Sequence, residues 1–228
     1  MGIVDHWSYS AINTYEKCPW AWYQSYVLRV KQAENDNFKI GKAFHYMLEM
    51  NAKRWLTDGS HYPLEESVKI FKSMWYKSHE LLVHSYYRKN DWLVPLGAEF
   101  IEWPFLIDCY GVKLKGVVDI VTADHDVMDY KTSTKPYATS DVQDSLQLDL
   151  YAGVYHERFK VLPRRVGYQV AMKDFSGVQK LTDTRSLAQV DKAFKLVKQY
   201  DDEVNDTKVF EKKRGRNCHW CDYRDVCL

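Results

Sequence analysis

Two short hydrophobic segments joined by a polar turn constrain the fold of this chain more than any other feature. Residues 112–121 are rich in β-branched side chains and predict one strand, and residues 127–132 predict a second. The Asp-His-Asp tripeptide at 124–126 is typical of a turn. If the turn is centred after residue 124, antiparallel partners have numbers that sum to about 249. The hairpin then places Asp119 opposite Asp129 or its neighbour.

This pairing predicts a site with a definite chemistry. Side chains directly opposite each other lie roughly 4.5–5.5 Å apart at Cβ, and two carboxylates that close repel unless a proton or a cation separates them. Lys131 follows Asp129 by two residues and shares its face of the strand. Such a set can hold a divalent metal and stabilise an activated water or a transition-state anion. The alternative is an ordinary solvated D-x-K segment, which the otherwise apolar strands disfavour.

Composition restricts the classes of partner. Of the 228 residues, 32 are Lys or Arg and 31 are Asp or Glu, which gives a net charge of +1. The protein is therefore not a basic nucleic-acid coat, and contact with nucleic acid would use a local groove. No stretch approaches the roughly 20 apolar residues of a membrane span. The first residues lack the basic and apolar regions of a secretion signal, so we expect a cytoplasmic protein without membrane contact.

The remaining pattern predicts an α/β fold. Helices are expected first, then three strands, a helix, a strand and a helix, which favours a small mixed sheet flanked by helices. We expect one domain over residues 1–228, with a mainly helical part at 1–95, an α/β core at 96–207 and a Cys-rich tail at 208–228. The predicted helices cover residues 11–17, 20–28, 40–55, 63–87, 141–159 (capped by Ser140) and 187–204, and the further strands cover 99–107, 166–172 and 178–181.

Two further side chains lie on one face of the helix that follows the second acidic strand. Gln147 and Tyr151 are four residues apart and therefore neighbours on the helix surface. Together they can hydrogen-bond a phosphate backbone or support a catalytic lysine. The alternative is a core tyrosine beside a surface glutamine.

The C-terminal tail carries a dense group of cysteines. Three thiols within ten residues leave a four-coordinate metal site one ligand short. Cys18, next to Pro19, is the natural fourth ligand, and Cys109 is its competitor. His219 keeps a Cys-and-His zinc site open, and thiols without a metal are the remaining alternative. The three tail cysteines are Cys218, Cys221 and Cys227.

Taken together, these motifs resemble the PD-(D/E)xK nuclease superfamily. More narrowly, they resemble RecB-type nucleases with an iron–sulfur cluster, such as the AddB nuclease domain and the CRISPR-associated exonucleases. The resemblance covers most of the chain, and its motifs occur in the family's order. They are the Ser10-to-Pro19 segment, Gly41-x-x-x-His45, Gly116-x-x-Asp119, Asp129-x-Lys131, Gln147-x-x-x-Tyr151 and the cysteine tail.

The resemblance implies roles for the residues of the acidic site. His45, Asp119 and Asp129 would bind Mg²⁺ or Mn²⁺, joined by the backbone carbonyl of Tyr130. Lys131 would orient the water or stabilise the pentavalent phosphate, while the Gln and Tyr of the following helix support the site and the DNA. Many relatives carry Glu where this chain has Asp129, and the shorter side chain alters the metal geometry. Glu99, on the strand before the hairpin, is either part of the site or a salt-bridged surface residue.

The resemblance also implies a second cofactor. Cys18, Cys218, Cys221 and Cys227 would hold a [4Fe-4S] cluster that pins the C-terminus to the N-terminal helices. The neighbouring basic residues would either track a DNA backbone or form an ordinary solvated loop. These basic residues are Lys212, Lys213, Arg214 and Arg216.

The function that follows is a metal-dependent DNA exonuclease that acts on single strands or DNA ends. Its partner would be DNA, together with proteins of recombination, replication or CRISPR adaptation, in a bacterial, archaeal or phage-infected cell. One alternative is a nucleic-acid-binding or assembly subunit that keeps the fold but does not cleave, against which the intact acidic set argues. A zinc-stabilised adaptor is a weaker alternative.

Overall fold

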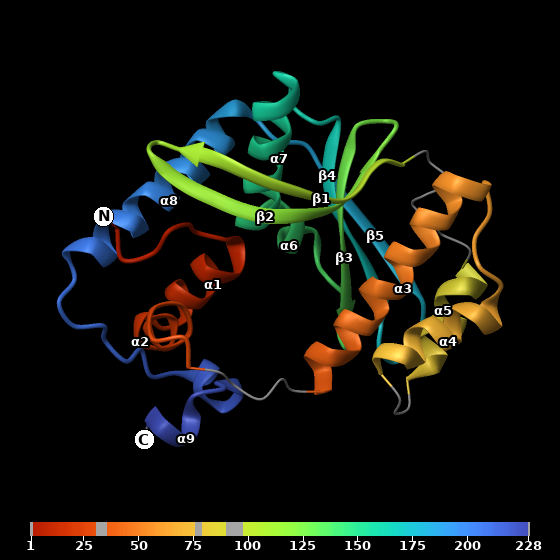
Figure 1. Cartoon of the computed structure of the whole chain (residues 1–228), viewed down its shortest axis with the longest axis horizontal. Helices are drawn as coiled ribbons and strands as arrows, with labels where there is room; N and C mark the ends of the chain where they lie inside the picture. Colours follow the sequence, from red (N-terminus) through yellow and green to blue (C-terminus); the bar gives the residue numbers. More distant parts are fainter. Residues whose placement is uncertain (1, 31–35, 76–78, 90–97, 228) are drawn as a thin grey trace.

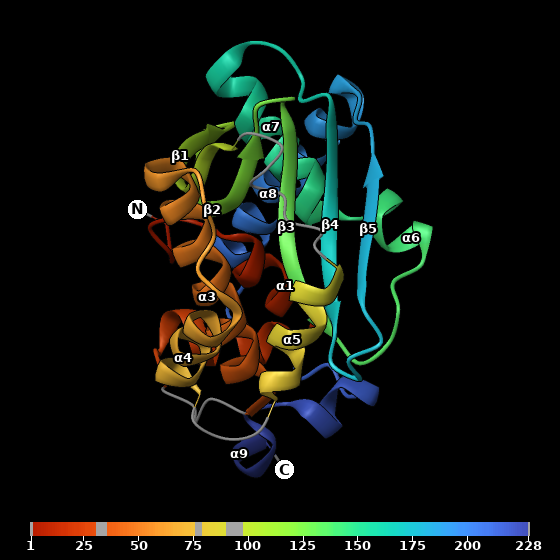
Figure 2. The ribbon, with the colours of Figure 1, turned by 90° about the vertical axis from the view of Figure 1, so that its right-hand side faces the viewer.

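A five-stranded mixed sheet forms the centre of the molecule (Figures 1 and 2). The computed structural model describes residues 2–30, 36–75, 79–89 and 98–227. The strands follow the chain order across the sheet, with β3 and β4 parallel and the other neighbours antiparallel. This confirms the predicted α/β fold. The strands are β1 (Ala98–Cys109), β2 (Val112–Thr122), β3 (Asp126–Ser133), β4 (Arg165–Met172) and β5 (Val178–Asp183).

Helices cover both faces of this sheet. Figure 2 shows α3, α4 and α5 in front of the sheet and α7 and α8 behind it. The described helices are α1 (Tyr9–Lys17), α2 (Pro19–Trp22), η1 (Tyr23–Val27), α3 (Asp36–Asp58), α4 (Leu64–Met74), α5 (Glu80–Lys89), α6 (Thr139–Gln143), α7 (Leu146–Phe159), α8 (Leu187–Asp206), η3 (Arg216–Trp220) and α9 (Arg224–Cys227). No helix in the described part of the chain is both long enough and apolar enough to cross a membrane.

The alternation of side chains along the central strands builds a hydrophobic core on each face. Ile120 and Met128 belong to the core beneath α3, α4 and α5. Val121 and Val127 are their neighbours in the chain and belong to the core on the other face, with α1, α7 and α8. Both faces of β2 over residues 118–122 and of β3 over residues 126–130 are therefore buried, and polar groups there need partners inside the protein.

A tight turn sets the register of the first hairpin. Cys109 pairs with Val112, which leaves Tyr110 and Gly111 as a two-residue loop. Both loop residues have positive φ, 55° and 84°, as a type I′ turn requires. The register that follows pairs Ile101 with Ile120. β1 therefore runs two residues further than the predicted end at residue 107.

The partner numbers in the second hairpin sum to 248, one less than the predicted value. Ile120 pairs with Met128 and Val121 with Val127, and the ladder ends there. Beyond this point β3 pairs with β4 along its whole length. In this register Asp119 lies opposite Asp129, one position beyond the last hydrogen-bonded pair of β2 and β3.

Two helices predicted as continuous are each divided. The expected helix over 63–87 ends at Met74, because Trp75 is extended (φ −143°), and α5 begins at Glu80. The two pieces pack together through a hydrogen bond of 2.5 Å between Ser67 Oγ and Tyr87 OH. Residues 76–78 of the predicted helix lie outside the described part of the chain.

The helix expected over 141–159 is divided at Ser145, whose hydroxyl caps α7 by accepting a hydrogen bond from Leu148 N at 3.3 Å. Ser140 is therefore not the cap of the long helix, contrary to the prediction. It lies inside the short helix α6. The same Ser145 hydroxyl contacts Tyr168 OH at 2.5 Å, which ties the break to the sheet.

The helices α1 and α2 near the N-terminus lie beside the C-terminal tail (Figure 1). Trp20 N donates a hydrogen bond of 3.1 Å to Glu211 O, and Ser25 Oγ lies 2.7 Å from Tyr223 OH. Pro19 occupies the first turn of α2, as expected, and the helix continues as a π-helical turn. The N-terminal helices and the C-terminal tail are therefore held together by direct contacts.

Candidate active site

The two predicted carboxylates are buried next to each other at the end of the second hairpin. Asp119 is 9% exposed and Asp129 2% exposed. Tyr130 N donates a hydrogen bond of 2.7 Å to Asp119 Oδ2, and His45 Nδ1, from α3, lies 3.4 Å from the same oxygen. Burial, followed by repulsion from Asp129, raises the pKa of Asp119 well above its ordinary value. Burial lowers the pKa of His45, which favours the neutral imidazole.

Asp129 connects Lys131 to the helix α7. Lys131 Nζ lies 2.6 Å from Asp129 Oδ2, and Gln147 Nε2 donates a hydrogen bond of 2.7 Å to Asp129 Oδ1. Burial alone would lower the pKa of Lys131, but attraction to Asp129 outweighs it, so that this pKa is raised. The lysine therefore stays positively charged at neutral pH.

The predicted Gln–Tyr pair supports this arrangement. Gln147 Oε1 accepts a hydrogen bond of 3.0 Å from Lys131 Nζ, while its amide also donates to Tyr151 OH at 3.0 Å. Tyr151 OH donates in turn to Val117 O on β2, at 2.8 Å. Tyr168 from β4 completes the surroundings, with its ring 5.2 Å from Lys131 Nζ. The amide of Gln147 thus orients the carboxylate and the ammonium at once.

The chemistry of these side chains fits a divalent cation. Asp119 and Asp129 are both buried, and Asp129 Oδ2 has an ion pair with Lys131 but no well-aligned hydrogen bond within the described chain. Oxygen ligands of this kind suit Mg²⁺ or Mn²⁺. However, among the residues that the structure describes, no group of three His, Cys, Asp or Glu side chains is arranged to hold a metal ion. The carboxylates instead point at the Tyr130 N–H, His45 and Lys131.

One acidic residue of the site was missed by the sequence analysis. Glu102 lies between the pairs Ile101–Ile120 and Trp103–Val118 of the first hairpin, and therefore opposite Asp119. Burial, repulsion from Glu49 and attraction to Lys53 leave the pKa of Glu102 raised to about 7. The signal was present in the sequence: centring the first turn on Tyr110-Gly111 gives this register by the same arithmetic that was applied to the second hairpin.

Glu99, which was considered for the site, lies elsewhere. The register of β1 shifts between Ala98 and Phe100, which makes Glu99 the irregular residue. Its carboxylate lies 3.7 Å from His125 Nδ1, and its side chain is 38% exposed. Its geometry matches the salt-bridged surface residue.

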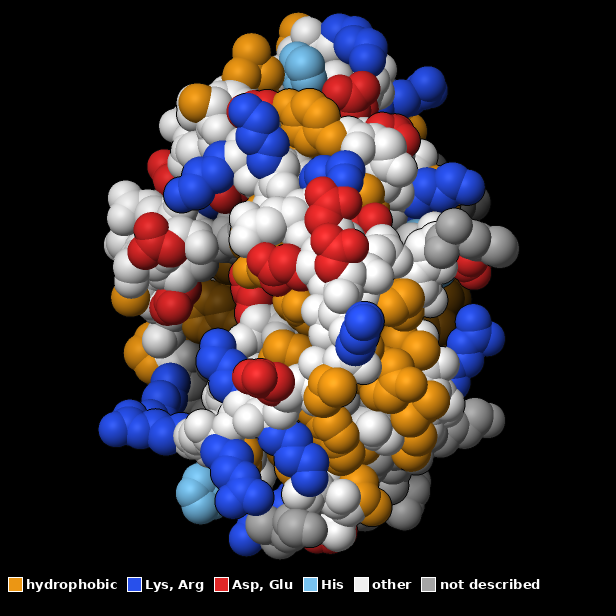
Figure 3. Space-filling view, turned by 90° about the vertical axis from the view of Figure 1, so that its left-hand side faces the viewer, with side chains coloured by type: hydrophobic (Ala, Val, Ile, Leu, Met, Phe, Trp, Pro, Cys, Tyr) orange, Lys and Arg blue, Asp and Glu red, His pale blue; other side chains and the backbone are white. Residues whose placement is uncertain are grey.

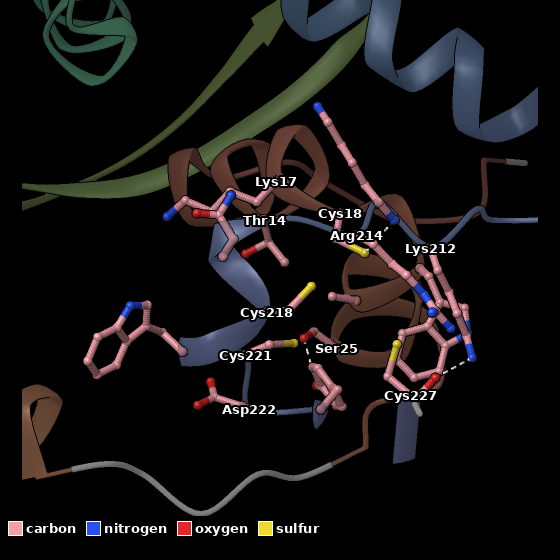
Figure 4. A pocket seen from close by; sticks show the side chains of 16 residues that line it. Thr14, Lys17, Cys18, Ser25, Lys212, Arg214, Cys218, Cys221, Asp222 and Cys227 are labelled. Carbon is pink, nitrogen blue, oxygen red and sulfur yellow. Dashed lines mark hydrogen bonds between the residues drawn. The ribbon is translucent and has the colours of Figure 1, made fainter. Parts of the chain in front are cut away.

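The four cysteines proposed as cluster ligands line a single pocket (Figure 4). Cys18 comes from the junction of α1 and α2, and the others come from the tail. Burial raises the pKa of Cys221, and the nearby thiols of Cys18, Cys218 and Cys227 add to the rise. Two backbone N–H groups, of Lys213 and Gly215, donate to Cys18 Sγ and Cys218 Sγ at 3.4 Å each.

The two alternative ligands are placed away from this pocket. Cys109 is fully buried in the hydrophobic core beside β2, where burial raises its pKa to about 12. His219 is exposed and does not line the pocket. Hydrogen bonds to sulfur are one of the features that tune an iron–sulfur cluster, but no three Cys, His, Asp or Glu side chains in the described part of the chain, these cysteines included, are arranged to hold a metal.

The basic tail residues divide into two pairs. Lys212 Nζ donates to Cys227 O at 2.6 Å, and Lys213 Nζ donates to Glu16 O at 3.0 Å. These two lysines therefore anchor the tail. Arg214 and Arg216 are exposed. Figure 3 shows Lys and Arg side chains at both the lower and the upper end of one face, with Asp and Glu side chains between them and a broad hydrophobic area beside the lower group, which is not the pattern of a basic coat.

The chain matches a known protein family in sequence and a solved structure in fold. The family model described as the PD-(D/E)XK nuclease superfamily matches residues 6–228. Among solved structures, the chain is similar to a "Putative exonuclease" from Eubacterium rectale, with a TM-score of 0.61 and 12% identity over 96% of this chain and 88% of that chain. The structure of SSO0001 gives a TM-score of 0.41 and 14% identity over 88% and 90%, respectively, which is too low to support a comparison. Among curated protein sequences, none matches this chain.

Proposed function

This chain belongs to the PD-(D/E)XK nuclease superfamily, and from that membership we propose that it is a metal-dependent DNA exonuclease acting on single strands or DNA ends. The observation that carries the proposal is the convergence of Asp119, Asp129 and Lys131, with Gln147 hydrogen-bonded to both members of the Asp129–Lys131 pair. Similarity in fold to the Eubacterium rectale protein supports the exonuclease activity.

The residues of the site would divide the work of phosphodiester hydrolysis. A bound Mg²⁺ or Mn²⁺ would supply charge neutralisation at the phosphate and a water of lowered pKa, and Asp119, Asp129, neutral His45 and the Tyr130 carbonyl would hold it. The Lys131 ammonium, kept charged by Asp129, would stabilise the additional negative charge on the phosphate in the transition state.

The tail cysteines would have a structural role in this proposal. Cys18, Cys218, Cys221 and Cys227 would hold a [4Fe-4S] cluster. The cluster would join the N-terminal helices to the end of the chain, adding to the direct contacts between Lys213 and Glu16. Visible absorbance and iron content of anaerobically purified protein test this part, since zinc would give neither.

The deciding experiment is digestion of end-labelled single- and double-stranded DNA with Mg²⁺, Mn²⁺ or EDTA. We expect metal-dependent release of nucleotides from an end by the wild-type protein and none by Asp119→Ala. DNA binding without cleavage under any metal would instead support the non-cleaving subunit. Identical cleavage by the wild-type protein and the Asp119→Ala variant would show that the activity comes from a contaminant or another site.

A further inference from the structure

A cavity of about 460 Å³ opens directly beside the catalytic lysine. Lys131 and Gln147 form one side of it, and its opposite sides come from α1 and from the segment that leads into α6. The volume falls in the range of roughly 300–1,000 Å³ that is usual for sites that bind small molecules. A group bound in this cavity would therefore lie next to the reacting phosphate.

Tyrosines form the apolar part of its wall. Tyr9 and Tyr137 are half-buried, and Tyr137 packs edge-on against Tyr168 with ring centroids 5.7 Å apart. The backbone of Tyr137 is fixed on both sides by Gln179, whose amide accepts from Tyr137 N and donates to Tyr137 O at 2.8 Å each. Rigid aromatic rings of this kind stack on nucleobases without regard to sequence.

The charge of the cavity argues against a phosphate inside it. Lys131 is the only cation among the described residues that line it, and Asp129 already neutralises that charge. Glu16, Asp141 and Asp144 line the same cavity and are exposed to solvent. A phosphate placed there would face three carboxylates, whereas an uncharged sugar and base would not.

On the premise that the protein is the nuclease proposed above, we infer that this cavity is the subsite for the terminal nucleoside of the strand, and that it accepts a hydroxyl end and disfavours a phosphorylated one. The Tyr9 and Tyr137 rings flank the base, and the acidic wall stops the strand from continuing past the first nucleotide. Cleavage beside Lys131 then releases the end of the strand, which makes the arrangement exonucleolytic.

The test uses internally labelled oligothymidylates that differ only at their ends: hydroxyl at both ends, phosphate at the 5′ end, phosphate at the 3′ end, or circular. Affinity is measured by fluorescence anisotropy in EDTA, and product release is measured with Mn²⁺. We expect a phosphate at one end to weaken affinity on the order of tenfold, while a phosphate at the other end has little effect. The circular molecule should be cut far more slowly than the linear one.

Matched variants assign the effect to the cavity. Asp144→Asn should reduce the penalty for the phosphorylated end, whereas Glu65→Gln, an exposed acid on α4, should leave it unchanged. Tyr137→Leu should weaken binding of the hydroxyl-ended strand about 5- to 100-fold, and Tyr137→Phe should restore it. If Tyr137→Leu does not fold, the exposed Asp144 variant still decides the question.

The outcomes separate this inference from the proposed nuclease. Equal affinity for the three linear molecules overturns the subsite even if Mn²⁺-dependent cleavage is present. Efficient cutting of the circle also overturns it, because a circle has no terminal nucleoside. Discrimination between ends without any cleavage would keep the subsite and reject the proposed nuclease.

Discussion

The backbone N–H of Tyr130 donates a hydrogen bond of 2.7 Å to the carboxylate of Asp119. It links β3 to β2 immediately after their backbone ladder has ended at Ile120–Met128. A side chain thus takes the place of a backbone carbonyl, and the strands separate without leaving a buried N–H unpaired. Because Tyr130 directly follows Asp129, the same contact fixes the distance between the two acids.

Replacing Asp119 with Asn should abolish cleavage and stabilise the metal-free protein. The pKa of Asp119 is raised in the folded state, so its destabilising effect is absent below the unfolded pKa, grows as the pH rises from the unfolded pKa to the folded pKa, and is constant above the folded pKa. A neutral amide removes that effect. We expect a higher thermal midpoint than the wild type in EDTA at pH 8, and a cleavage rate lower by at least about 10²-fold. A lower midpoint would show that the charge of Asp119 is compensated inside the protein.

Replacing Lys131 with Met should separate binding from catalysis. The substitution keeps the length of the side chain and removes the charge that pairs with Asp129. Turnover should fall by about 10²-fold or more, since an electrostatic stabiliser of the transition state is lost, while Mn²⁺ still raises the thermal midpoint. Lys135→Met, an exposed lysine in the following loop, is the matched control. Equal turnover of the two variants would reduce Lys131 to an ordinary surface charge.

Gln147 and Lys131 should behave as one unit. Gln147 Oε1 accepts from Lys131 Nζ at 3.0 Å, and Gln147 Nε2 holds the Asp129 carboxylate. Gln147→Leu should therefore lower turnover. The double variant with Lys131→Met should lose much less activity than the sum of the losses in the two single variants. The measurement is a double-mutant cycle on kcat. Additive losses would mean that Gln147 acts on the substrate or the fold, and not through the lysine.

Glu102 should make the stability of the metal-free protein depend on pH near neutrality. Its pKa is raised from 4.5 to about 7, so the folded state binds the proton more tightly than the unfolded state, and stability decreases as the pH rises through this range. Glu102→Gln should flatten the dependence of the thermal midpoint between about pH 5 and pH 8. Glu99→Gln, on the same strand with a 38% exposed side chain, should leave the dependence intact. An unchanged profile in Glu102→Gln would assign the titration to another group.

Much of this architecture could be predicted because local signals fixed it. The β-branched runs predicted the central strands of the mixed sheet. The acids inside these runs and the one-turn spacing of Gln147 and Tyr151 predicted side chains that the structure brings together. The residues themselves carried these signals, since an acid in a strand whose two faces are buried needs a partner.

The remaining features depend on tertiary contacts that no local pattern contains. Trp75 leaves the helical conformation so that α5 can fold back on α4. Ser145 divides the next helix while contacting Tyr168 from a distant strand. The basic tail was predicted from charge alone, and only the fold reveals that Lys212 and Lys213 donate to backbone carbonyls.

The last prediction concerns the cysteines, and it follows from the length of chain between them. Nearly the whole domain lies between Cys18 and Cys218, so a cluster held by both would close a very long loop. The loop-closure entropy predicts that a cross-link of this length stabilises the folded state by about 5 kcal/mol. This value is comparable to the net stability of a typical domain. Cys18→Ser and Cys227→Ser should each lose iron and visible colour and lower the thermal midpoint. Cys109→Ala is the matched control: it loses some packing, because Cys109 is fully buried, but it should keep its iron. Iron retained in Cys18→Ser and lost in Cys109→Ala would mean that the N-terminal helices are not tied to the tail through a cluster.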